Sequence, residues 1–332
     1  MKQKYIISNL VYGQLYPDLF VQNQLKSLCD PTNLPELQEK YDCEFVLFTD
    51  EPTLQHITKH PNFTQLTRWC PVHTVLLHWP ADADQFASRY NLLAQMLQQV
   101  VPEAIEKNAI LSAWVADLVV AKGALPKILS HFDRGHDAVF MVPIRAAADS
   151  VNGVLAQLPG APTDLELFEL AYRNLHHLWV ASQWNAPQFT RMPYSILWNS
   201  YTGLVAHNLG VTPIAFKPNE KMLKVQGGID SDLPGMCENP YWATDWIDAP
   251  VAGVEPLSNG HYPPFAQAPA NIQNVTEWAL KGNGGKPCIY RSQANHISKP
   301  LYYPSRKIFN DPDLAERASD IAGRIQAQIL GG

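Results

Sequence analysis

The sequence predicts an α/β fold built on a mostly parallel sheet with helices on both faces. Strand-like and helical patterns alternate from residue 5 to residue 145, as expected when each strand is followed by a covering helix. The strand-like runs are apolar throughout, which is typical of strands that are buried on both faces. The chain has 332 residues, 46% hydrophobic and 17% charged, so it can bury a large core.

Four apolar runs in the first half predict the strands of this sheet. They lie at residues 4–13, 43–52, 110–120 and 137–145, and the first of them ends in a glycine. The run at 110–120, which contains the acid Asp117, is expected to form one continuous strand. The run at 137–145 is likewise expected to be a single buried strand.

Two segments between these strands have helical signals. Residues 16–29 begin with a proline and an aspartate, which suit a first helical turn. Residues 80–108 show the strongest amphipathic pattern, with Asp82 or Asp84 as the expected N-cap. Pro102 is expected to end or kink this helix.

The second half has a less regular pattern. A helix is predicted over 163–184, with Thr163 as its N-cap in a capping box. His176 and His177 are adjacent on this expected helix, so their side chains should point in different directions and not clamp a metal. A closing helix should follow Asp311, which is a suitable N-cap.

The domain organisation follows from this difference between the halves. Residues 1–150 are expected to form a regular α/β half, and 151–310 a second half of the same domain. The latter is rich in proline and tryptophan and should carry short strands and irregular connections. Residues 311–332 are expected to form a C-terminal helix.

Composition and missing motifs exclude several classes of protein. The net charge of −6 and the lack of a basic run disfavour nucleic acid as a partner. No apolar run approaches the roughly 18 residues of a membrane helix, and no secretory signal is visible. Five scattered cysteines indicate free thiols in the cytoplasm. The glycine-rich dinucleotide and P-loop motifs, H-E-x-x-H and G-x-S-x-G are all absent.

Candidate ligand-binding residues follow the predicted strands. Parallel sheets bind ligands beyond the carboxyl ends of their strands, and these ends carry Tyr12, Asp50, Asp117 and Arg145. The carboxylate of Asp117 can bind a metal, cap a helix or accept a hydrogen bond from a ribose hydroxyl. These alternatives stay open on the sequence alone.

Further acids and cations lie in the second half. Asp230 and Asp232 flank a serine in a glycine-rich stretch, and Asp-x-Asp pairs offer the oxygen ligands that Mg²⁺ and Mn²⁺ prefer. Asp245 and Asp248 lie nearby in sequence, and Asp245 is a candidate base. A late cluster of basic residues is suited to a diphosphate through charge-assisted hydrogen bonds; its members are Arg291, His296 and Lys299.

The ordered set of first-half motifs resembles the GT-A type glycosyltransferases, a superfamily of nucleotide-diphospho-sugar transferases. The motifs are "IISNLVYG", "FVLFTDEPT" and "SRYNLLAQMLQQVVPEAIEKNAILSAWVADLVV", and they span roughly residues 4–145. The second half is similar to an uncharacterised bacterial group of this type, in "ELAYRNLHHLW", "GLVAHNLGVTPIAFKP" and "IDSDL".

The resemblance implies that residues 1–150 bind the nucleotide sugar and that residues 151–310 form the acceptor side. It also implies roles for particular residues. Tyr12 and Asp50 would face the nucleotide base and ribose, and Arg89 and Asn91 would approach the nucleotide. Asp117 would take the second place of the family's Asp-x-Asp motif.

This sequence departs from the family at the first place of that motif, where Val115 stands. Three alternatives follow. Asp117 acts alone on a metal, the pair Asp230 and Asp232 supplies the metal site, or cations such as Arg291 and Lys299 stabilise the diphosphate without metal. The candidate metal ligands are Asp117, Asp232 and His296. Mn²⁺ or Mg²⁺ is the expected cofactor in the first two cases, and none is needed in the third.

The leading hypothesis is a glycosyltransferase that moves a sugar from a nucleotide-sugar donor to a hydroxyl of a glycan or other acceptor in bacterial glycan synthesis. Asp230, Asp232 and Asp245 are its candidate catalytic bases. The alternative is a catalytically degenerate protein of the same fold that binds a sugar or nucleotide. A nucleotidyltransferase ranks lowest, because the turn after the first strand has one glycine and no Lys or Arg.

Overall fold

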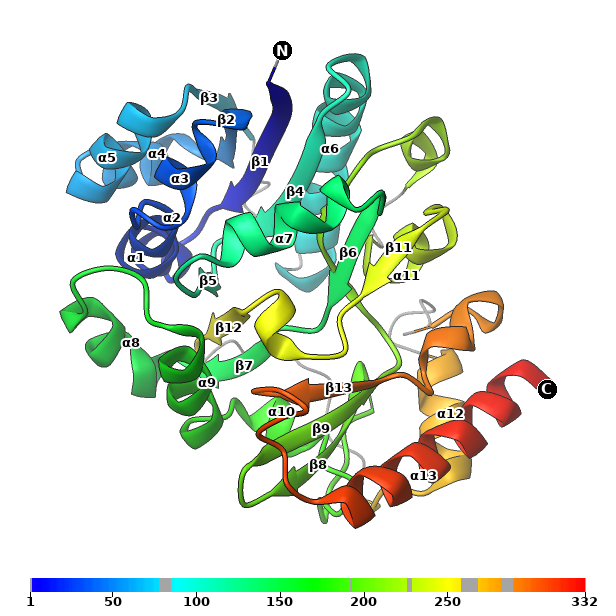
Figure 1. Cartoon of the computed structure of the whole chain (residues 1–332). Helices are drawn as coiled ribbons and strands as arrows, with labels where there is room; N and C mark the ends of the chain where they lie inside the picture. Colours follow the sequence, from blue (N-terminus) through cyan, green and yellow to red (C-terminus); the bar gives the residue numbers. More distant parts are fainter. Residues whose placement is uncertain are drawn as a thin grey trace.

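The large sheet forms the centre of the molecule. A computed structural model describes residues 2–77, 85–191, 193–225, 229–257, 268–281 and 289–331. Within these ranges the chain forms a seven-stranded sheet and two three-stranded sheets (Figure 1). The strand order of the large sheet is β11-β6-β10-β4-β1-β2-β3. Its strands are β1 (Gln3–Val11), β2 (Tyr41–Thr49), β3 (Val72–Leu76), β4 (Ile110–Val115), β6 (Ala138–Met141), β10 (Thr212–Phe216) and β11 (Pro240–Trp242).

The large sheet is parallel except at β10. This strand comes from the second half of the chain and inserts between β4 and β6, antiparallel to both. The strands β1, β2, β4 and β6 are buried over most of their length, as their continuous apolar runs predict. The expected mixed α/β fold with a mostly parallel sheet is therefore confirmed.

Helices cover both faces of the large sheet. On one face α6 (Gln85–Glu106) buries Met96 and Val100 against Ile6 and Phe48. On the other face lie α1 (Tyr16–Leu19), η1 (Phe20–Gln24), α2 (Leu25–Leu28), α3 (Leu34–Leu37), α5 (Pro61–Trp69) and α7 (Ala124–Asp133). Helix α4 (Glu51–Ile57) follows β2. Pro102 lies inside α6, and the proposed caps Asp82 and Asp84 fall outside the described residues.

Two segments that the sequence predicts as single strands are each divided between two sheets. The chain leaves the large sheet after β4 and β6 and continues as β5 (Leu118–Val120) and β7 (Ile144–Ala147). These pair with β12 (Val251–Glu255) in a small sheet of order β5-β12-β7. The prediction of continuous strands over 110–120 and 137–145 was therefore wrong. Pro143 explains the second break, because it has no N–H to continue a ladder.

The predicted helix over 163–184 is also divided. Helix α9 (Asp164–Arg173) begins with the expected capping box at Thr163, and α10 (His177–Val180) begins again after His176. The expectation that the two histidines point apart was wrong, because the backbone between these helices is not helical. Their ring centroids are 4.1 Å apart. Helix α8 (Ala148–Gln157) precedes this region.

The third sheet forms a separate hydrophobic core with the C-terminal helices. It has the order β13-β9-β8 and comprises β8 (Ser195–Ser200), β9 (Gly203–Asn208) and β13 (Pro300–Tyr303). It packs with α12 (Ile272–Lys281) and α13 (Pro312–Gly331) at one end of the molecule (Figure 1). The predicted cap of α13 is confirmed, because Asp311 accepts a hydrogen bond from the Leu314 N–H at 3.0 Å.

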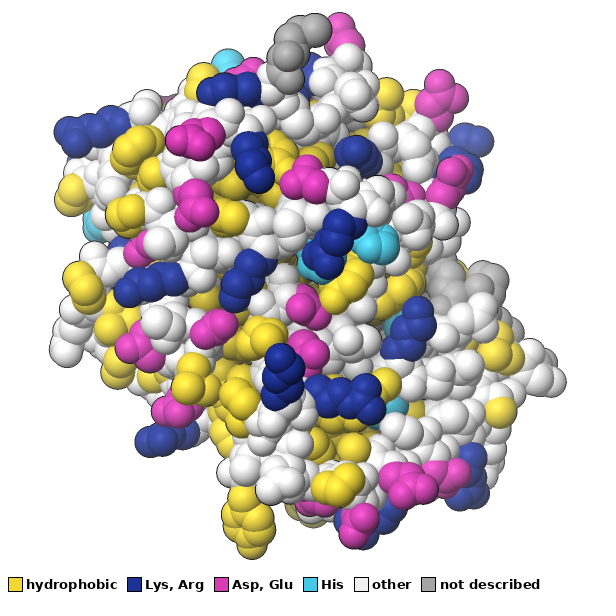
Figure 2. Space-filling view, viewed as in Figure 1, with side chains coloured by type: hydrophobic (Ala, Val, Ile, Leu, Met, Phe, Trp, Pro, Cys, Tyr) yellow, Lys and Arg dark blue, Asp and Glu magenta, His cyan; other side chains and the backbone are white. Residues whose placement is uncertain are grey.

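The remaining elements are short helical turns. They are η2 (Glu220–Lys224), α11 (Ile229–Asp232), η3 (Leu233–Gly235), η4 (Trp246–Asp248) and η5 (Arg291–His296). Across the described ranges, no helix combines the length and apolar character needed to cross a membrane. On the face shown in Figure 2, basic and acidic side chains are interspersed without a large patch of either sign.

Candidate active site

The strand order of the large sheet contains a switch point between β1 and β4. From β1 the chain builds β2 and β3 on one side, and then returns to place β4 on the other side. In open α/β sheets, ligands bind in the crevice beyond the carboxyl ends of the two strands at such a point. Here these ends lead to Tyr12 and Asp117.

Asp117 lies at the junction of the large and small sheets, between β4 and β5. Its side chain is almost fully buried, and its backbone carbonyl accepts a hydrogen bond from the Val254 N–H at 2.7 Å. The link to β12 fixes the backbone at this point. Val115, two residues earlier, is 38% exposed, so the apolar side chain at the first place of the motif faces solvent.

An ion pair lies next to Asp117 in the small sheet. Arg145 on β7 donates to Glu255 at the end of β12, with 2.5 Å between the guanidinium nitrogen and the carboxylate oxygen. The Glu255 side chain is only 6% exposed, whereas that of Arg145 is 33% exposed. The guanidinium therefore has an open side from which a ligand can approach.

Arg145 interacts electrostatically with three carboxylates. Burial alone would lower the pKa of Arg145, but the negative charges of Glu255, Asp117 and Asp230 outweigh burial and raise its pKa above the ordinary value. We call these four residues the Arg145 cluster. Since the charges of three carboxylates act on one guanidinium, the cluster has an excess of negative charge when all four groups are ionised.

Asp230 reaches this cluster from a distant part of the sequence. It lies in the short helix α11, which packs against β10 of the large sheet. Burial raises the pKa of Asp230 to about 6, although the charge of Arg145 acts in the opposite direction. Its carboxyl group can therefore gain or release a proton close to neutral pH, as a general acid or base requires.

The two histidines lie beside the Arg145 cluster. The His176 N–H donates to the Arg145 carbonyl at 2.9 Å, and its imidazole is fully buried. Burial, with the nearby charges of His177 and Arg145, lowers the pKa of His176 to about 4. Burial also lowers the pKa of His177, while Glu255 raises it. His176 is thus neutral at physiological pH, and its backbone is joined to that of Arg145.

Two of the predicted nucleotide-binding residues lie at neighbouring strand ends. Tyr12 is half-buried after β1, with its ring centroid 6.4 Å from that of Tyr16. Asp50 follows β2 and caps α4 by accepting a hydrogen bond from the Thr53 N–H at 2.8 Å. The side chains of three others, Arg89, Asn91 and Arg291, lie outside the described part of the structure.

Asp232 ends α11, two residues after Asp230, and three further predicted site residues, Asp245, His296 and Lys299, make contacts of their own. Asp245 accepts a hydrogen bond from the Arg306 N–H, which ties its loop to the segment after β13. His296 is buried and stacks on Trp242, with ring centroids 4.5 Å apart and planes 8° apart. Lys299 places its ammonium group 5.8 Å from the centroid of the Trp242 ring. These contacts are sufficient to explain the three residues structurally.

Metal ligation by the predicted trio Asp117, Asp232 and His296 has no geometric support. Among the residues that the structure describes, no three His, Cys, Asp or Glu side chains are grouped to hold a metal ion. A metal at the Arg145 cluster would therefore need oxygen ligands from a bound substrate as well as from the protein.

Glu255 is the member of the cluster that sequence reasoning missed. It ends the buried apolar strand "VAGVE", as Asp117 ends "ILSAWVAD". A lone acid that ends a buried run is the signal that could have found it. Tryptophans of the second half lie in two environments. Trp179, Trp198 and Trp246 are core residues, whereas Trp184 and Trp242 are partly exposed.

Comparison with known proteins adds no assignment to this geometry. No protein-family model matches the chain, and a search of curated proteins finds no match.

Proposed function

We propose that the protein is a glycosyltransferase of the GT-A type, which transfers a sugar from a nucleotide-sugar donor to an acceptor hydroxyl. The observation that carries the proposal is the Arg145 cluster at the β1/β4 switch point. It joins Asp117 of the first half to Asp230 and Glu255 of the second. The family motifs in residues 4–145 and the mostly parallel sheet support the same proposal.

In this proposal the donor lies along the carboxyl ends of β1, β2 and β4. Tyr12 and Asp50 face the base and ribose, and the diphosphate lies toward Asp117. The excess of carboxylates in the cluster disfavours a bare diphosphate, so added positive charge is needed. Mg²⁺ commonly binds through one or two carboxylates together with substrate phosphates. Asp117 is the acid that would hold Mg²⁺ or Mn²⁺ there together with the substrate phosphates, and the cation would neutralise the leaving group.

Asp230 is the proposed base. In an inverting reaction its carboxylate takes the proton of the acceptor hydroxyl, whose oxygen forms the new bond to the anomeric carbon. The bond from that carbon to the diphosphate oxygen breaks, and its electron pair leaves with the nucleoside diphosphate. A pKa of about 6 leaves Asp230 largely ionised and still basic at pH 7.

Nucleotide titration calorimetry tests the proposal. UDP, GDP and CMP are each titrated with and without Mn²⁺, and one of them should bind more tightly with the metal. Asp117→Asn should weaken that binding by about tenfold or more, because a carboxylate ligand is lost. Asp320→Asn, on the exposed face of α13, is the control and should bind as the unaltered protein does. If none of the three nucleotides binds under either condition, the proposal fails.

A non-catalytic nucleotide-binding protein is the second candidate. It is favoured by the exposed Val115 at the place where the family carries an acid. Release of free nucleoside diphosphate from a nucleotide sugar by the purified protein separates the candidates. A transferase releases it through slow hydrolysis of the donor, and a binding protein does not.

A further inference from the structure

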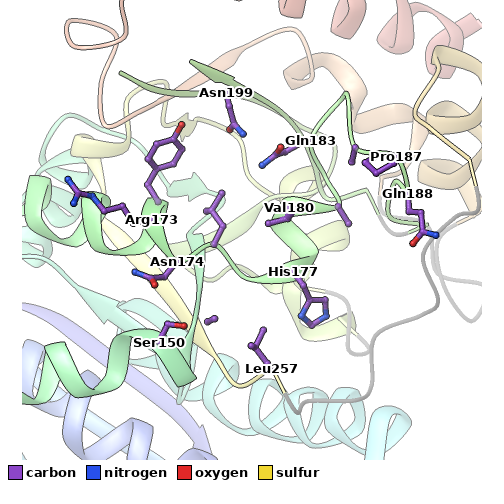
Figure 3. Close-up of a pocket in the computed structure, with 15 residues that line it drawn as sticks. Ser150, Arg173, Asn174, His177, Val180, Gln183, Pro187, Gln188, Asn199 and Leu257 are labelled. Carbon is purple, nitrogen blue, oxygen red and sulfur yellow. The ribbon is translucent and has the colours of Figure 1, made fainter. Parts of the chain in front are cut away.

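A groove opens beside the Arg145–Glu255 pair. Its volume is about 820 Å³, within the range of small-molecule sites. The groove is lined by residues at the ends of β7 and α9, in α10, in the loop after it and on β8 (Figure 3). Asn199 and Gln183 lie across the space from Ser150 and Leu257 in this view.

The register of the small sheet places this groove next to the ion pair. Ala147, which lines the groove, is the ladder partner of Glu255 in the parallel pairing of β7 and β12. Arg145 and Ala147 are two residues apart on one strand, so their side chains lie on the same face of the sheet. His177, which also lines the groove, interacts electrostatically with Glu255, whose negative charge acts to raise the pKa of the imidazole. A ligand that fills the groove therefore ends close to the Arg145 cluster.

Uncharged polar side chains provide most of the hydrogen-bonding capacity of the groove. Four of them, Ser150, Gln183, Gln188 and Asn199, make no side-chain hydrogen bond to any residue in the described ranges. Each amide offers two donors and an acceptor, and the hydroxyl offers one donor and two acceptors. Such a set matches a ligand with many hydroxyl groups.

The charge of the groove indicates a neutral ligand. Among its lining residues that the structure describes, none is acidic, and the guanidinium of Arg173 faces Glu169 at 3.6 Å. Exposed apolar side chains at Val180 and Leu257 supply surface for the C–H faces of a sugar ring. The groove thus combines neutral polar groups with small apolar patches.

We propose that this groove binds a neutral saccharide. This inference rests on the proposed function for its role: the saccharide is the acceptor, with a hydroxyl directed toward Glu255 and Asp230. The binding of the saccharide itself does not depend on the donor.

The test is saturation-transfer NMR, followed by calorimetry, on the full chain without nucleotide. The probes are neutral trisaccharides of glucose, galactose, mannose or N-acetylglucosamine at up to about 10 mM. The groove variant is Gln183→Ala/Asn199→Ala. The matched control is Gln98→Ala/Gln99→Ala, which removes two exposed amides from α6. Unfolding in urea confirms that both variants keep the fold, since neither pair of amides has a described side-chain partner.

At least one trisaccharide should bind, and the groove variant should weaken its binding by about tenfold or more, whereas the control should not. UDP binding should be equal in both variants. The inference is overturned if no probe binds, or if binding survives in the groove variant. Nucleotide binding without saccharide binding would refute only the proposal that the groove binds a saccharide. Saccharide binding without nucleotide binding would refute only the proposed glycosyltransferase function.

Discussion

At the scale of single residues, the distinctive feature is a guanidinium surrounded by acids that lie far apart in the sequence. Arg145 interacts with Asp117, Asp230 and Glu255, which come from three separate segments. Their charges act on the same arginine, although only Glu255 forms an ion pair with it. The pKa of Asp230 depends on the charge of Arg145, and this dependence can be measured.

The pKa of Asp230 should be near 6 and should rise when Arg145 is replaced. The positive charge of Arg145 favours the ionised carboxylate, so Arg145→Gln should move the titration to a pH above 6. Carboxyl-detected NMR, with Asp230→Asn to assign the signal, measures both values. An Asp230 signal that titrates near pH 4 in the unaltered protein would contradict the burial of this group.

Replacing Arg145 by an uncharged residue should lower the free energy of unfolding, because Glu255 is buried. Arg145→Met leaves the buried carboxylate without its ion-pair partner and should cost about 2–3 kcal/mol, a value reduced for the partial exposure of Arg145. Arg145→Met/Glu255→Leu should recover most of this loss, because both charges are then gone. Urea unfolding measures the two variants, and equal instability of both would argue against the ion pair.

At the scale of elements, the site depends on strands that change sheets. The apolar pattern alone predicts that Asp117 belongs to a buried strand segment. The break after β4 could not be predicted, because residues 110–120 are apolar on both sides of the junction. The insertion of β10 into the large sheet is also a long-range event that no local pattern encodes. The prediction of one continuous helix over 163–184 was wrong for a related reason, since the apolar periodicity of the sequence continues through the break at His176.

Gly203 shows how tightly the third sheet is built. Its φ is +155°, and a Cβ at this position would lie 2.0 Å from the Tyr303 carbonyl oxygen of the neighbouring strand. Gly203→Ala should therefore destabilise the protein by several kcal/mol, on the order of 3 kcal/mol.

Gly323, in the middle of α13, is the matched control because a Cβ there meets nothing within 4 Å. Gly323→Ala should stabilise the protein by as much as about 1 kcal/mol, since alanine is the better helix former. Urea unfolding of the two variants provides the comparison. An unchanged stability of Gly203→Ala would show that β9 and β13 do not approach this closely.

At the scale of the whole molecule, buried neutral histidines link stability to pH. Burial lowers the pKa values of His131, His176 and His207 to about 4, with nearby positive charges adding to the effect at the first two. The unfolded chain binds these protons at about pH 6.5. The stability that comes from keeping these histidines neutral is therefore fully present above pH 6.5. It is lost as the pH falls toward 4, by as much as about 3 kcal/mol for each histidine.

His207→Asn isolates one of these contributions. The imidazole makes a hydrogen bond of 2.7 Å between Nδ1 and the Ile297 carbonyl oxygen, and the asparagine amide can replace that donor. The variant should lose less stability than the unaltered protein between pH 6.5 and pH 4. The raised pKa of Asp230 has the opposite effect, because it adds stability as the pH falls. This contribution is the same in both proteins and cancels when their stabilities are compared. Identical pH dependence in urea unfolding would contradict the prediction.

The most direct test of the account is a crystal structure of the protein soaked with a nucleoside diphosphate and Mn²⁺. The account predicts the nucleotide beyond the carboxyl ends of β1 and β4, with its phosphates toward Asp117 and the Arg145 cluster, and with the groove left open. A nucleotide bound in the groove, or elsewhere on the molecule, would contradict the assignment of the switch point as the donor site.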